Sequence, residues 1–139
     1  MRFVLDNSVS MRWLFEDGSP SDIKYSDIVL DALSEGEAIV PVVWAVEVTN
    51  VLVRSERAGV ISTQKSDAFL KTLSALPIDT DLESTTRALT DGLAIARRFK
   101  LSAYDASYLE LSLRLDIPFA TLDDDLRKAA RKARVNLLT

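Results

Sequence analysis

The stretch Arg2-Phe3-Val4-Leu5-Asp6-Asn7-Ser8 decides the fold class. Residues 2–5 form a short apolar segment typical of a buried strand, and Asp6 ends it. Four later segments share this character, at residues 37–40, 77–79, 118–121 and 135–138. Helical patterns separate them, so the strands need crossover connections. This arrangement predicts an α/β fold with a parallel sheet covered on both faces.

The segments between the strands carry helical spacing and helix-ending residues. A Ser or Thr stands near the start of several of them, where it can cap the helix. Gly59 follows another and suits the left-handed backbone conformation that often ends a helix. No repeat, linker or low-complexity stretch interrupts residues 1–139, so we expect a single domain. The predicted helices are residues 7–15, 21–33, 43–58, 63–76, 82–99, 103–115 and 123–133.

The composition excludes much chemistry. The chain has 139 residues, 47% of them hydrophobic and 27% charged, and it contains neither histidine nor cysteine. Disulfides, thiol nucleophiles and Ser-His catalysis are therefore excluded. Any metal must be held by oxygen, which favours Mg²⁺ or Mn²⁺. No stretch resembles a membrane span or signal peptide, so we expect a cytoplasmic protein without a membrane partner.

The charge is unevenly distributed along the chain. The net charge of −4 argues against a nucleic-acid partner, but basic residues are concentrated late in the sequence. Such a block can bind phosphates, although a solvated helix face more often explains any single one of these residues. The weak candidates for RNA contacts are Arg127, Lys128 and Arg131.

Carboxylates stand where a parallel sheet places its ligands, beyond the carboxyl ends of the strands. Asp6 and Asp123 each follow a predicted strand, and Asp105 opens a predicted helix. Each of these carboxylates also has a purely structural explanation. Asp6 can cap a helix, Ser102 and Asp105 fit a capping box, and Asp123 lies at a helix start, where negative charge is favourable.

Glu47 is harder to explain structurally. It lies in a predicted helix, residues 43–58, that is apolar almost all round and therefore expected to be buried. A buried carboxylate needs a partner. Arg54 lies two turns on and offers an ion pair, and metal ligation is the alternative.

Together the four acids predict a metal site. Carboxylates held close together raise one another's pKa, and a divalent cation removes the conflict. One or two such ions also turn water into a nucleophile at neutral pH without histidine.

At this point the chain resembles the PIN-domain family. The matching segments are residues 4–8, 41–47 with Asn50, 101–111 and 120–123. Within that family it looks most like VapC ribonuclease toxins of toxin–antitoxin pairs. The resemblance implies an α/β/α sandwich with a parallel sheet of about five strands, Mg²⁺ or Mn²⁺, and endonucleolytic cleavage of structured RNA such as tRNA or rRNA. It also implies two partners, a small VapB-like antitoxin and a second copy of the chain.

The resemblance places Asp6, Glu47, Asp105 and Asp123 at the family's acidic positions. Ser8, Asn50 and Thr121 fall where supporting polar residues are common. The run from Asp123 to Asp125 leaves the last ligand open, with Asp124 as the reserve. Asn7 departs from the family, in which a smaller residue is frequent at this place.

Other functions fit less well. A haloacid-dehalogenase-type phosphatase needs an aspartate where Ser8 stands, and a receiver domain needs an acidic pair that Asn7 prevents. A P-loop is missing. Two alternatives stay open, a non-catalytic binding module that keeps the acids, and a metal-dependent DNA nuclease of the same fold.

Overall fold

The four strands form one parallel sheet in the order β3-β2-β1-β4. The structure is a computed structural model that describes all residues 1–139. The strands are β1 (Arg2–Leu5), β2 (Glu37–Pro41), β3 (Ile78–Asp81) and β4 (Phe119–Ala120). In register, Val4 pairs with Ile39 on one side and with Phe119 on the other. The predicted α/β class with a parallel sheet is confirmed.

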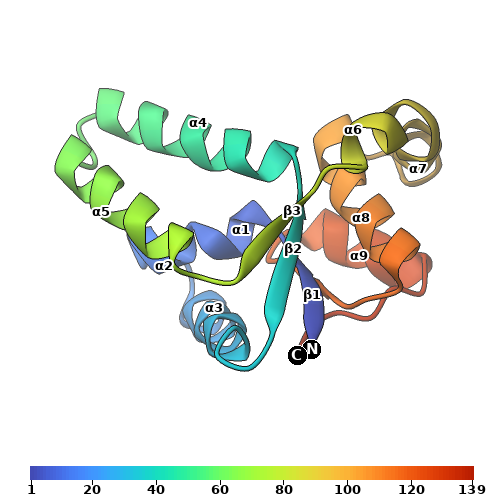
Figure 1. Ribbon diagram of the computed structural model, residues 1–139, viewed down its shortest axis with the longest axis horizontal. Helices are drawn as coiled ribbons and strands as arrows, with labels where there is room; N and C mark the ends of the chain where they lie inside the picture. The colour runs from blue at the N-terminus through green and yellow to red at the C-terminus, as the bar shows by residue number, and fades with distance from the viewer.

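Helices cover both faces of the sheet (Figure 1). On one side lie α1 (Asn7–Ser10), α2 (Arg12–Phe15), α3 (Pro20–Ala32), α4 (Val43–Arg57) and α5 (Thr63–Ser74). On the other lie α6 (Ser84–Arg87), the π-helical turn η1 (Ala88–Gly92), α7 (Leu93–Phe99), α8 (Ala103–Leu115) and α9 (Asp124–Lys132). None of these helices combines the length and apolarity needed to cross a membrane.

Side chains of β1 alternate between two cores. Phe3 and Leu5 belong to a buried cluster with Val29 of α3, whereas Val4 packs with Tyr108 and Leu109 of α8. This is the period-two alternation of a strand whose two faces are both covered. A third cluster joins α2, α4 and α5 and reaches the sheet at Ile78 of β3. The central strand β1 is therefore fixed from both faces.

The structure departs from the sequence expectations in four places. Residues 135–138 form no strand, and only an isolated bridge pairs Leu137 with Phe119. The predicted helix 82–99 contains the π-helical turn η1, and the predicted helix 7–15 is divided at Met11. In α4 only Val48 and Leu52 are buried. Val46, which we expected inside, is 70% exposed.

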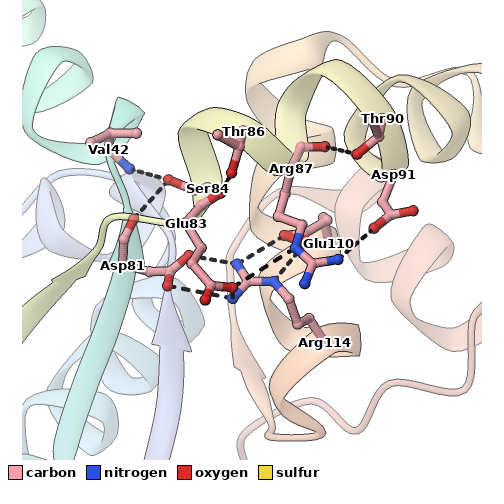
Figure 2. Close-up of polar contacts among 10 residues, drawn as sticks. All are labelled: Val42, Asp81, Glu83, Ser84, Thr86, Arg87, Thr90, Asp91, Glu110 and Arg114. Atoms are coloured by element: carbon pink, nitrogen blue, oxygen red, sulfur yellow. Dashed lines mark hydrogen bonds and ion pairs between the residues drawn. The ribbon is translucent and has the colours of Figure 1, made fainter.

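An ion network joins α8 to the end of β3 and to α6 (Figure 2). The Arg114 Nε donates to Glu110 Oε1 at 2.7 Å, and Nη2 lies 2.5 Å from Asp81 Oδ2. Glu83 adds a third carboxylate at 3.3 Å. These hydrogen bonds and charges raise the pKa of Arg114 above its ordinary value. Ser84 connects the same region to the start of α4, because its Oγ accepts from the Val42 N–H at 3.1 Å.

We predict that Arg114→Met destabilises the fold by about 3 kcal/mol, because it leaves the Glu110 carboxylate buried without a cation. The side chain of Glu110 is only 4% exposed. Arg87→Met is the matched control, since Arg87 is 44% exposed in its ion pairs and the loss there should stay below about 1 kcal/mol. Urea unfolding measures both. Equal losses in the two variants would refute the buried role of Arg114.

Candidate active site

Asp6 lies at the carboxyl end of β1, where the chain turns into α1. It is 5% exposed. Its Oδ2 accepts hydrogen bonds from the Ser8 hydroxyl at 2.6 Å and from the Thr121 hydroxyl at 2.7 Å. The side chain makes no cap hydrogen bond to α1, so helix capping does not explain this buried acid.

The two hydroxyl groups also hold the loop that follows β4. Ser8 Oγ accepts from the Leu122 N–H at 3.0 Å, and Thr121 Oγ1 accepts from the Asp123 N–H at 3.1 Å. Thr121 is fully buried. A buried hydroxyl needs such partners. Both residues therefore sit where polar support was expected, and they join the ends of two neighbouring strands.

Asp123 follows β4 and serves as the N-cap of α9. Its Oδ1 accepts from the Leu126 N–H at 2.9 Å, so the capping explanation of this residue is correct in part. Its Oδ2 makes no hydrogen bond, and its charge raises the pKa of Asp6. Asp124 is exposed and makes no side-chain hydrogen bond. The structure thus brings Asp123, rather than the reserve residue Asp124, next to Asp6.

Two helices bring the remaining acids to the same end of the sheet. Asp105 lies in the first turn of α8, where its N–H donates to the capping Ser102 Oγ at 3.1 Å. Glu47 lies in α4, and its Oε1 accepts from the Tyr108 hydroxyl at 2.5 Å. Arg54 is exposed and forms no ion pair with Glu47. The ion-pair alternative for Glu47 is therefore not what the structure contains.

The carboxylates influence one another electrostatically. Burial is the largest cause that raises the pKa of Asp6, of Glu47 and of Asp105. The charges of Asp6 and Asp105 raise the pKa of Glu47 further. Burial together with Asp6, Asp123 and Asp125 brings the pKa of Asp105 to about 6. No Lys or Arg forms an ion pair with any of the four acids, so their repulsion is not neutralised by the protein.

The other candidates are less closely involved. Asn50 is exposed and makes no hydrogen bond to the acids. Arg127 is engaged elsewhere, because its Nε donates to Thr121 O at 2.7 Å and its guanidinium lies over the Tyr25 ring. Arg131 is exposed. Of the three basic candidates, Lys128 alone lines a cavity that reaches the acids.

Sequence reasoning missed two neighbours of the acids. The first is Tyr108, whose buried hydroxyl donates a hydrogen bond to Glu47. The pKa of Tyr108 is raised by burial and by the charges of Asp6 and Glu47. Asp125 contributes to the electrostatics of Asp105. The acidic run from Asp123 to Asp125 indicated that Asp125 lies near the site. The sequence did not show which residue of the run lies near Asp6 and which lies near Asp105.

Comparison with family models matches residues 3–132 to the PIN domain. The chain belongs to the PIN-domain family. PIN domains are typically nucleases, and PIN nucleases generally use divalent metals. The expected resemblance is thus confirmed at the level of the family. A search of curated proteins finds no match.

Solved structures share the PIN fold at low sequence identity. PAE2754 from Pyrobaculum aerophilum is 18% identical, with a TM-score of 0.67 over 93% of this chain and 79% of that one. VapBC2 from Rickettsia felis, bound to a DNA fragment from their promoter, is 10% identical, with a TM-score of 0.68 over 99% and 98%. FitAcB from Neisseria gonorrhoeae is 16% identical, with a TM-score of 0.57 over 100% and 97%.

The donor set of this PIN domain fits Mg²⁺ or Mn²⁺. All four candidate side chains are carboxylates, the oxygen ligands that these ions prefer. A cation would also relieve the repulsion that raises their pKa values. The side chains do not form a preassembled centre, because no three of them lie close enough together to hold a metal. The fit therefore rests on donor chemistry and charge.

We predict that Asp105 makes the metal-free protein less stable as the pH rises from 3.8 to about 6. In that window the unfolded chain has released the Asp105 proton and the folded chain still binds it, so raising the pH favours unfolding. Asp105→Asn removes this contribution. The melting temperature of the variant minus that of the wild type should therefore increase across the window and then level off. A difference that is independent of pH would contradict the raised pKa.

Proposed function

We propose that residues 1–139 act as a single PIN-like domain and that this domain is a divalent-metal-dependent endoribonuclease. The observation that carries the proposal is the buried Asp6 carboxylate, which is paired with no cation. Glu47, Asp105 and Asp123 lie near enough for the charges of the four acids to influence one another. Such an arrangement is costly unless something positive occupies it. Perturbed acids gathered at the carboxyl end of a parallel sheet are typical of a functional site.

Each acid has a role in this proposal. Asp6, Glu47, Asp105 and Asp123 would hold Mg²⁺ or Mn²⁺ through carboxylate oxygens. When bound, the ion supplies an activated water and neutralises charge on the scissile phosphate. The hydroxyls of Ser8 and Thr121 fix Asp6 Oδ2, and the Tyr108 hydroxyl orients Glu47 through Oε1. These residues position the ligands and need not touch the substrate.

We further propose that the chain is the toxin of a toxin–antitoxin pair, as VapC proteins are. The similarity to VapBC2 and to FitAcB supports this reading through the fold. The partners would be a small VapB-like antitoxin and a second copy of the chain. Val46 of α4 and Leu70 of α5 are exposed apolar side chains that contacts with such partners would bury.

The activity is tested with purified protein and a mixture of structured RNAs. We expect cleavage with Mg²⁺ or Mn²⁺ and none with EDTA. Asp6→Asn and Asp105→Asn should each lower the rate by about two orders of magnitude or more, because a ligand of the ion is lost. Asp27→Asn, an exposed acid of α3 without a partner, is the control and should cleave like the wild type.

Three outcomes would overturn the proposal. Full activity in both site variants would refute the site. Absence of cleavage with every RNA and metal would favour the non-catalytic binding module, whereas cleavage of DNA alone would favour the DNA nuclease.

The toxin proposal gives a separate prediction. Expression of the wild type in a bacterial host should arrest growth, because RNA is cleaved, and Asp6→Asn should abolish the arrest. Co-expression of a small protein encoded beside the chain should restore the growth of cells that express the wild-type chain. Growth curves measure all three, with an immunoblot to show that both forms accumulate equally. Equal growth of the two forms would reject the toxin reading.

A further inference from the structure

A large cavity opens beside Asp105, one of the four candidate acids. Its volume is about 710 Å³, and it lies between the end of α7, the segment that leads into α8, and α9. Asp105 and Asp125 line one part of it. Four cations line the rest, Arg98, Lys100, Lys128 and Lys132. Figure 1 shows the three helices together on the same side of the sheet.

None of these four cations forms an ion pair with a carboxylate of the chain, and Arg98 contacts only the ring of Phe99. Lys128 and Lys132 stand four residues apart in α9, a spacing at which like charges destabilise a helix slightly. Four like charges around one cavity repel one another. The cavity therefore favours an anionic occupant that carries more than one charge.

The cavity continues as a groove away from the acids. A second cavity, of about 480 Å³, shares Arg98, Phe99 and Lys132 with the first. Its other lining residues include Ile95 and Arg134. The groove thus begins at Asp105, passes between basic side chains of α7 and α9, and reaches a fifth cation beside an apolar patch. Its course suits an extended polyanion better than a single small anion.

An aromatic ring lies in the shared part of the groove. Phe99 is half-buried, and the guanidinium of Arg98 lies 5.1 Å from the centre of its ring. Aromatic rings and guanidinium planes are the surfaces on which unpaired bases stack. A positively charged groove with such a surface is typical of proteins that bind single-stranded nucleic acid.

We propose that this groove binds a single-stranded segment of RNA, with Arg98, Lys100, Lys128 and Lys132 on its phosphates, and leads the strand to Asp105. The inference rests on the proposed function, because it assigns the substrate path of the same site. A nucleic acid fits better than an acidic peptide because its bases can stack on the Phe99–Arg98 surface. Asp105, at the start of the groove, marks where the RNA strand would meet the proposed metal site.

The test is fluorescence anisotropy with a labelled, unstructured RNA of about twelve nucleotides, in EDTA and over a series of salt concentrations. Arg98→Ala/Lys100→Ala and Lys128→Ala/Lys132→Ala should each bind about tenfold more weakly at low salt. Each should also lower the slope of log affinity against log salt by about 1.4, since a single strand gives about 0.7 per phosphate contact.

The matched control is Lys65→Ala/Lys71→Ala. Both residues are exposed on α5 and form no ion pair. Replacing both removes two positive charges, as each groove variant does. This variant should bind RNA within about twofold of the wild type, with the same salt slope. Any groove variant with a lowered melting temperature is replaced by the variant that has Gln instead of Ala at the same two positions. A folding defect is then not taken for lost binding.

The outcomes separate this inference from the proposed function. Groove variants that bind and cleave like the control would overturn the groove and leave the nuclease intact. Groove-dependent binding by a wild type that never cleaves would uphold the groove and overturn the nuclease. Equal losses in the control would overturn the groove, as would groove-dependent binding of a labelled poly-glutamate peptide without binding of RNA.

Discussion

The constraint on which the rest of the structure depends is a buried, uncompensated carboxylate at the end of the central strand. β1 lies between β2 and β4 and is covered on both faces, so Asp6 at its end has little access to water. No cation of the chain meets it. Two hydroxyls from separate segments, Ser8 and Thr121, hold its Oδ2 instead. They fix the geometry of the carboxylate and leave its charge for a ligand to balance.

The more distant acids depend on how α4 and α8 are held against the sheet. Glu47 and Asp105 lie on different helices, and the Tyr108 hydroxyl of α8 contacts Glu47 of α4 directly. At the opposite end of α8, Arg114 connects this helix to Asp81 of β3. Ser84 links the same region to the first residues of α4. In the proposed nuclease, the polar network would therefore contribute indirectly, by fixing the relative position of the two helices that carry Glu47 and Asp105.

Much of this arrangement was predictable because it follows from local patterns. Asp6 and Asp123 were found from strand ends, and α8 has the predicted bounds 103–115. The misses concern pairings between distant segments. Residues 135–138 are apolar enough for a strand but make only the bridge at Leu137. The spacing of apolar residues predicts which face of a helix is apolar, but not which segment packs against that face. The exposure of Val46 and the contact between Tyr108 and Glu47 were missed for this reason.

The distribution of charge reconciles an acidic protein with the anionic substrate that we propose. The net charge of −4 is an average over the surface, whereas a polyanion responds to the local potential. Close to the acids a phosphate is repelled unless a divalent cation stands between them. Along the groove, Lys128 and Lys132 attract it. Attraction and repulsion therefore act at different points of one path. A strand held in the groove would reach the acids productively only when the metal is bound, so metal occupancy, rather than RNA affinity, would control cleavage.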